Sequence, residues 1–210
     1  MNRLYGEYAA SRLGGQFGEM SSWRLVYPYL RDKRVLDIGC SDGLYLRYLS
    51  KDSRGIEQVP ALAEVGRRNG LNIINEDLTQ SIRQLKNEAF EGVLLSHVLE
   101  HIDSPLLMLR EIHRLLESKG TLVVGLPTER NVYRDLLRMN YFNGTHLYAF
   151  SVRNAHRLLA EAGFVPIRVF FHLPKCGNPI GRILENCWNL NRWPFHEYFS
   201  MAYWIVATKL

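Results

Sequence analysis

Cysteine and long apolar runs are both scarce in this chain of 210 residues. The three cysteines are an odd number and lack the paired spacing of a zinc site or a disulfide framework. The longest uncharged stretch near the carboxyl terminus, residues 198–208, is too short to cross a bilayer as a helix. The amino terminus has charges and glycines where a signal peptide needs an apolar core. These absences predict a reduced, cytoplasmic protein without a transmembrane segment.

An excess of acidic residues is also missing. The net charge is +5, and residues 111–210 hold the whole excess, because Lys/Arg and Asp/Glu balance in residues 1–110. Basic residues concentrate in 130–182, with eight Lys/Arg against two Asp/Glu. A basic field over the whole protein would indicate nucleic acid, whereas a local one suits an anionic small molecule or surface equally well. The charge alone therefore leaves an anionic small molecule, a negatively charged surface and nucleic acid open as partners.

Short apolar runs alternate with helical patterns through the middle of the chain, which is typical of βαβ units. This rhythm predicts an α/β fold: a doubly wound, Rossmann-like sheet of seven mostly parallel strands, helices on both faces, and an antiparallel last strand. We expect strands at 34–38, 54–57, 72–75, 92–96, 121–125, 164–171 and 198–208, and helices near 23–30, 43–50, 60–69, 79–87, 104–118 and 151–162. Residues 1–210 then form a single domain, with a helical cap (1–33), a cofactor-binding core (34–126) and two substrate-side insertions (127–150 and 172–197).

The first predicted strand runs into the turn DIGCSDG, residues 37–43. Glycine lets a ligand approach the backbone closely, since no side chain stands in the way. A dinucleotide site would need G-x-G-x-x-G to seat a pyrophosphate at the helix start, but Asp42 stands there and would repel that anion. The turn therefore disfavours an NAD-dependent oxidoreductase and suits a ligand that carries positive charge.

This turn resembles the D-x-G-x-G-x-G pattern of the class I S-adenosylmethionine-dependent methyltransferases, with Ser41 in place of the middle glycine. The segments SHVLEH and GTHLYAFSVRNAHRLLAEAGF resemble the subgroup that contains the ubiquinone-biosynthesis O-methyltransferases, so the likeness spans residues 34–171. It implies that Glu57 accepts hydrogen bonds from the ribose hydroxyls and that Asp77 lies near the adenine amino group. The expected cofactor-binding residues are Asp37, Gly39, Cys40, Ser41, Gly43, Glu57, Gln58, Asp77, Leu78, Ser96 and His97. Taken singly, Asp37 and Asp42 could only cap a helix, and Glu57 could be a solvated loop acid.

Histidines supply the candidate catalytic groups. His97 and His101 have the H-x-x-E-H spacing of some zinc peptidases and would share a helical face. No downstream acid stands out as a third ligand, so we expect no metal. His146 lies in the insertion after the fifth strand, where a base could reach an acceptor hydroxyl, and His101 is the second candidate. The alternative for His146 is a hydrogen bond within its own loop.

Two further patterns bear on the substrate and on partners. Arg130, Arg134 and Arg138 are spaced to share one helical face, either as a solvated stripe or as a wall that binds an anion. Residues 178–191 have helical apolar spacing, which predicts a cover for the substrate side or the contact of a homodimer; membrane association is the weaker option.

The resemblance implies methyl transfer from S-adenosylmethionine to a small-molecule acceptor, on oxygen and with an acceptor that can be anionic. The sequence has neither an N/D-P-P-Y/F motif nor a Pro-Cys nucleophile, which disfavours a nucleic-acid methyltransferase. An RNA methyltransferase and a non-catalytic partner subunit that keeps the fold remain the alternatives.

Overall fold

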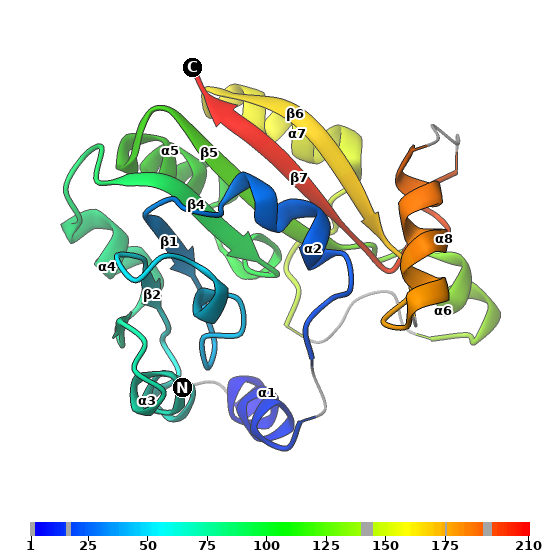
Figure 1. The fold of residues 1–210 in the computed structure, drawn as a ribbon, viewed down its shortest axis with the longest axis horizontal. Helices are drawn as coiled ribbons and strands as arrows, with labels where there is room; N and C mark the ends of the chain where they lie inside the picture. The colour runs from blue at the N-terminus through cyan, green and yellow to red at the C-terminus, as the bar shows by residue number, and fades with distance from the viewer. Residues whose placement is uncertain (1–2, 16–17, 140–144, 175, 191–194) are drawn as a thin grey trace.

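A computed structural model describes residues 3–15, 18–139, 145–174, 176–190 and 195–210 of the chain. Within these residues, seven strands form one sheet in the order β3-β2-β1-β4-β5-β7-β6 (Figure 1). The strands are β1 (Val35–Ile38), β2 (Arg54–Ile56), β3 (Ile73–Ile74), β4 (Phe90–Ser96), β5 (Leu116–Pro127), β6 (Phe164–His172) and β7 (Ala202–Lys209).

The sheet is parallel from β3 to β5, and β7 runs antiparallel to both β5 and β6. The first strands are short and buried on both sides, as expected where helices cover both faces of a parallel sheet. The predicted α/β fold with an antiparallel last strand is therefore confirmed.

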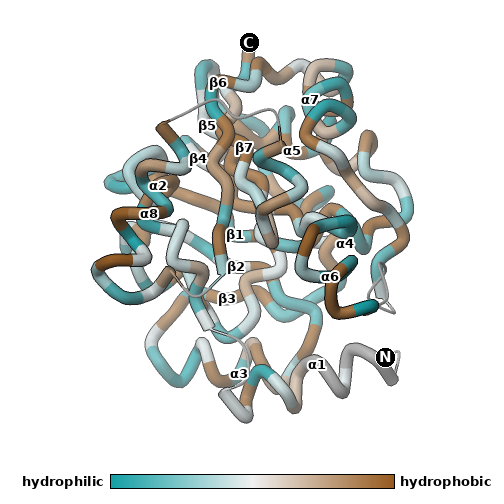
Figure 2. Tube along the Cα trace, turned by 90° about the vertical axis from the view of Figure 1, so that its right-hand side faces the viewer, coloured by the Kyte–Doolittle hydropathy of each residue, from teal (hydrophilic) through white to brown (hydrophobic). Residues whose placement is uncertain are grey.

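Alternate side chains of the strands build two cores on opposite faces of the sheet. On β4, Val93 and Leu95 join a core with α4 (Leu78–Gln84), α5 (Pro105–Leu115) and α7 (Val152–Glu161). Leu94 points the other way, toward α2 (Trp23–Val26) and the 3-10 turn η1 (Tyr27–Tyr29), which lie in front of the sheet in Figure 1. Figure 2 shows these surrounding helices alternating between hydrophobic and hydrophilic residues, as amphipathic helices do.

The amino-terminal segment covers the sheet through a buried aromatic cluster. Trp23 packs on Tyr45 and Trp204, with ring centroids 4.5 and 6.1 Å apart. The indole nitrogen of Trp204 donates a hydrogen bond to the hydroxyl of Ser22, 3.0 Å away. Helix α1 (Arg3–Leu13) precedes this cluster and packs near α3 (Pro60–Arg68). Helix α2 ends at Val26, and Pro28 lies in the 3-10 turn that follows, so the proline limits the helix predicted over residues 23–30.

Three predicted boundaries are wrong. Instead of a helix over 43–50 there is one 3-10 turn, η2 (Leu46–Tyr48), because Gly43 adopts a left-handed φ of +84° at the expected helix start. The helix predicted to reach residue 118 ends at Leu115, since Leu116 already pairs with Phe90 on β4. The last strand starts at residue 202 rather than 198, because residues 195–199 form a turn closed by the Phe199 N–H and the carbonyl of residue 195.

Two helices follow the carboxyl ends of the later strands: α6 (Val132–Leu136) after β5 and α8 (Pro179–Leu190) after β6. On α8 the apolar residues Ile180, Ile183 and Leu184 face outward, and the buried face carries Gly181 and Glu185. The homodimer contact expected of this segment stays a prediction. No helix among the described residues is both long and apolar enough to cross a membrane.

Candidate active site

A cavity of about 1190 Å³ opens where β1, β2 and β4 end. It is lined by the turn after β1, by the residues after β2 and β4, and by side chains from α1, α5, α6 and the 145–146 segment. Ligands bind at this edge of open α/β sheets because the loops after the strands diverge there.

The turn after β1 forms one wall of the cavity. Gly39 has a φ of +71°, and a Cβ at this position would lie 2.5 Å from Val98. The N–H groups of Gly39 and Cys40 both donate to the carbonyl of Ile56, at 2.8 and 3.1 Å, which ties the turn to β2. Ser41 also lies in the left-handed region, with a φ of +55°. The backbone itself therefore faces the cavity, as the glycine pattern predicted.

Glu57 holds this turn in place from β2. One carboxylate oxygen accepts a hydrogen bond from Ser41 N–H at 2.9 Å, and the other accepts from Val59 N–H at 2.7 Å. The side chain is buried, so it is no solvated loop acid. Burial raises the pKa of Glu57, and the two backbone donors oppose that rise. Each carboxylate oxygen retains a second lone pair that a ligand hydroxyl can use.

Asp37, at the end of β1, is a buried acid beside Glu57. Its Oδ2 has no hydrogen-bond partner among the described residues. Burial raises the pKa of Asp37 to about 8, and the negative charge of Glu57 adds to that rise. A donor or a positive charge in the cavity would stabilise the ionised form, so the site suits a cationic ligand better than an anionic one.

Asp42 does not point freely at the cavity, because Arg12 of α1 neutralises it. The guanidinium lies 2.8 Å from Asp42 Oδ1, and the Arg12 side chain is only 8% exposed. A second guanidinium, that of Arg47, lies 3.6 Å from Oδ2. Helix α1 thus contributes Ser11 and Arg12 to the cavity lining, and the helical cap expected over residues 1–33 stays a prediction.

The structure brings almost all predicted cofactor residues to this one cavity. Gly43 is the exception: its φ of +84° and its packing against Leu71 explain the glycine, but it does not line the cavity. Asp77 is the N-cap of α4 and accepts from the N–H groups of Thr79 and Gln80, both at 3.0 Å. The predicted residues on the cavity wall are Asp37, Gly39, Cys40, Ser41, Glu57, Gln58, Asp77, Leu78, Ser96, His97, His101 and His146.

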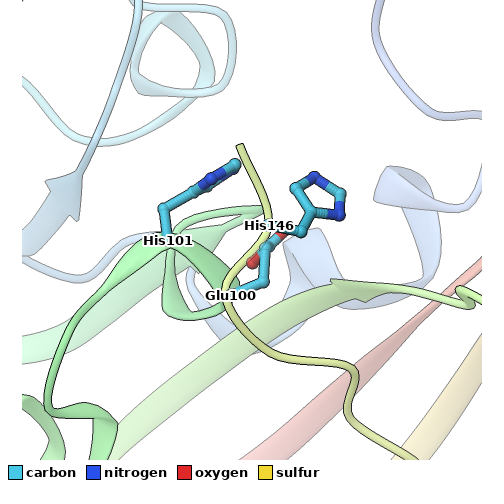
Figure 3. Close-up of side chains that lie close together, drawn as sticks. All are labelled: Glu100, His101 and His146. Atoms are coloured by element: carbon cyan, nitrogen blue, oxygen red, sulfur yellow. The ribbon is translucent and has the colours of Figure 1, made fainter. Parts of the chain in front are cut away.

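Histidines 101 and 146 both line the cavity and lie next to each other (Figure 3). Their rings lie edge to face with centroids 4.8 Å apart. His101 belongs to the 3-10 turn η3 (Leu99–His101), and its Nδ1 lies 2.9 Å from the carbonyl of Thr145. Burial lowers the pKa of His101, which favours the neutral imidazole. The regular helix that would place His97 and His101 on one face is absent here, because His97 adopts a φ of +55°.

An acid from the end of β5 orients His146. Glu129 is buried, and its Oε1 contacts Nδ1 of His146 directly. Arg134 of α6 lies 3.7 Å from the other oxygen of Glu129 and also lines the cavity. The predicted arginine stripe is wrong, because α6 spans only residues 132–136 and leaves Arg130 and Arg138 outside the helix. Arg134 alone of these three reaches the cavity.

Sequence reasoning missed three of the residues that shape this site. Glu129 stands two residues after the end of β5, at the edge where such sheets bind ligands, so its place was a usable signal. Arg12 carries no local signal, since its partner lies 30 residues further along the chain. Glu100 stands inside the H-x-x-E-H segment but was not singled out as a site residue, and only the structure shows that it is fully buried beneath His101 and His146.

Comparisons with known proteins agree with this geometry. A family model described as a methyltransferase domain matches residues 16–169. A ubiquinone biosynthesis O-methyltransferase of Xanthomonas campestris is 33% identical over 100 residues, which cover 44% of this chain and 42% of that protein. A tRNA U34 carboxymethyltransferase of Sulfurimonas denitrificans is 26% identical over 120 residues, covering 50% of this chain and 40% of that protein. The chain thus matches about half or less of the length of these two relatives.

Solved structures show the same fold. A S-adenosylmethionine-dependent methyltransferase of Archaeoglobus fulgidus superposes with a TM-score of 0.70 at 22% sequence identity, covering 90% of this chain and 92% of that one. At this identity the likeness concerns the architecture of the sheet and its helices.

Proposed function

Since this chain belongs to the class I S-adenosylmethionine-dependent methyltransferases, we propose that it transfers the methyl group of that cofactor to an oxygen atom of a small-molecule acceptor. The main support for the proposal is that one cavity is lined by two chemically different groups of residues. The glycine turn and its buried acids form one wall, and His101 and His146 form the other.

The wall around the turn fits the cofactor. Asp37 Oδ2 and Ser41 Oγ are buried polar atoms without hydrogen-bond partners among the described residues, so a ligand with donors would satisfy them. Glu57 keeps lone pairs for the ribose hydroxyls, and Gly39 leaves room for atoms against the backbone. When bound, the cofactor supplies an activated methyl group on a sulfonium, so the protein has mainly to align the acceptor oxygen with it.

The histidine wall fits the acceptor. An acceptor hydroxyl must lose its proton as the oxygen attacks the methyl carbon, whereas a carboxylate needs no such help. His146, positioned by Glu129, and His101, positioned by the Thr145 carbonyl, are the groups that would face that oxygen. Arg134 also lines this part of the cavity, and its guanidinium lies 3.7 Å from Glu129.

An RNA acceptor is the second candidate. Its support is the resemblance to a tRNA U34 carboxymethyltransferase, together with the exposed arginines 130, 138 and 182. The sequence has neither an N/D-P-P-Y/F motif nor a Pro-Cys nucleophile, so we place the small-molecule acceptor first. The three cysteines form no disulfide, which supports a cytoplasmic place of action.

The experiment has two parts. Calorimetry should show that the purified chain binds S-adenosylmethionine or S-adenosylhomocysteine in preference to NAD. Incubation with isotopically labelled cofactor and separated small-molecule and RNA fractions of a lysate should then label a small molecule that has gained one CH₂. Label found only in RNA would replace the proposed acceptor class, and NAD binding without binding of either adenosyl compound would refute the cofactor.

A further inference from the structure

A further histidine lines the cavity from the far side of the sheet. His172 is the last residue of β6, and its side chain is 17% exposed. It pairs with Ala202 of β7, which pairs in turn with Pro127 of β5. Directly paired residues of neighbouring strands put their side chains on one face of the sheet, and all three residues line the cavity. The imidazole of His172 therefore stands at the end of an apolar row formed by Pro127 and Ala202.

A buried acid holds the His172 ring at Nδ1. Glu185 of α8 is 0% exposed, and its Oε1 lies 3.2 Å from that nitrogen. Figure 1 shows α8 beside the end of β6, and the Leu173 N–H also donates to Oε1, at 3.2 Å. From the amino-terminal segment, the Ser21 hydroxyl lies 3.1 Å from both oxygens and Arg24 Nη2 lies 3.2 Å from Oε2. Donors from three segments thus satisfy the Glu185 carboxylate and fix it beneath the ring.

This contact decides which nitrogen of His172 can meet a ligand. A carboxylate can only accept, so Nδ1 carries the proton in the hydrogen bond to Glu185. The Ser21 hydroxyl lies 3.5 Å from the same nitrogen, but it donates to Glu185. In the neutral ring Nε2 then holds the lone pair. Among the described residues Nε2 has no hydrogen-bond partner, so it is available to a molecule in the cavity.

His172 lies too far from the cofactor residues to act as a base at the methyl group. The sheet order places β6 three strands beyond β4, whose last residue, Ser96, is an expected cofactor-binding residue. Neighbouring strands are about 4.8 Å apart, so the ends of β4 and β6 are separated by roughly 14 Å. A group of the acceptor that meets His172 is therefore different from the oxygen that receives the methyl group.

We propose that His172 binds a carboxyl group of the acceptor through Nε2. The inference rests on the proposed function and names its substrate class, a hydroxy acid with an apolar body that lies over Pro127 and Ala202. The proton that the acid loses, directly or through solvent, is taken up by Nε2, and the resulting imidazolium pairs with the carboxylate. Glu185 stabilises the charged ring from the Nδ1 side, since an opposite charge at hydrogen-bond distance favours the ionised form. In this arrangement His172 determines specificity, and Glu185 is a positioning residue.

The test compares two hydroxy acids with their uncharged amides. Calorimetry on the full chain, with and without S-adenosylhomocysteine, uses 3-hydroxybenzoate and 3-hydroxyphenylacetate as probes, each beside its amide. At least one acid should bind about tenfold more tightly than its amide, the scale of one charged hydrogen bond.

His172→Asn separates the two ring nitrogens. The asparagine amide can still donate to Glu185 in place of Nδ1, but nothing replaces Nε2. The acid should therefore lose about tenfold in affinity, while the amide probe binds as before. His172→Gln, whose amide lies nearer the position of Nε2, should restore part of the preference. The matched control is His156→Asn on α7, a histidine that does not line the cavity, and it should bind both probes like the wild type.

Two results would overturn the subsite: no preference for either acid over its amide, or the same preference in wild type and His172→Asn. Methyl transfer from labelled cofactor is measured on the same samples. With an acid that is methylated, His172→Asn should raise KM and leave kcat nearly unchanged, and an unchanged KM would remove the subsite alone. A preference for the acid that depends on His172, without any methylated small molecule, would support the subsite and remove the proposed function instead.

Discussion

Replacing Asp37 by Asn should remove a dependence of folding stability on pH that this one buried acid creates. Burial, and next the charge of Glu57, raise the Asp37 pKa to about 8 in the folded, cofactor-free protein. In the unfolded chain an aspartate titrates near its ordinary pKa of about 3.9. Between these two values the folded state holds the proton more firmly than the unfolded state. The free energy of unfolding must therefore fall as pH rises through that window.

The magnitude follows from the two pKa values. A fully developed difference of one bound proton changes the free energy of unfolding by about 1.4 kcal/mol per pH unit. Between pH 5.5 and 7.5 nearly all of that slope applies, which gives a loss of about 2–3 kcal/mol due to Asp37. Above the folded pKa the contribution of Asp37 levels off. The asparagine side chain of the variant has no such proton to lose, so the variant should lack this loss.

Urea unfolding of the cofactor-free protein at pH 5.5, 6.5 and 7.5 measures the effect. The informative quantity is the difference between wild type and Asp37→Asn at each pH, because contributions of the histidines cancel in it. That difference should move by about 2–3 kcal/mol in favour of the variant as pH rises. Asp52→Asn, at an exposed acid, is the control and should track the wild type. Parallel profiles of wild type and Asp37→Asn would refute the raised pKa.

Two further variants test the turn and its support. Glu57→Ala should weaken binding of S-adenosylmethionine in calorimetry by about 1–3 kcal/mol, the scale for losing a charged hydrogen-bond acceptor. The control Glu64→Ala, on the exposed side of α3, should leave the affinity unchanged. Equal affinities of wild type and Glu57→Ala would mean that Glu57 does not bind the cofactor. Gly43→Ala should lower the free energy of unfolding by about 1–3 kcal/mol more than Gly70→Ala. Both glycines have a positive φ, but only at Gly43 would the new Cβ meet a neighbour, Leu71 Cδ1 at 2.0 Å. Equal losses in denaturant unfolding would mean that backbone strain alone requires the glycine.

The sequence by itself determined the sheet, the order of its elements and most of the residues that line the cavity beside the turn after β1. Period-two and period-3.6 patterns are local, and so is the requirement for glycine where a strand turns into a ligand site. The turn keeps the predicted form although Ser41 replaces a glycine of the pattern, because a small polar residue tolerates the φ of +55° found there. The helix predicted over residues 43–50 was wrong because an apolar pattern compatible with a helix does not reveal that the glycine at its start adopts a left-handed φ.

Tertiary structure alone decided the histidine wall. His146 meets Glu129 across 17 residues and His101 across 45, and Arg12 meets Asp42 across 30. No periodicity in the sequence encodes such pairs, since they depend on how α1 packs on the turn after β1 and how the segments after β4 and β5 fold over one another. The burial of Glu100 is of the same kind. Its position in H-x-x-E-H suggested a helix face, but only packing placed its carboxylate beneath two imidazoles and away from water.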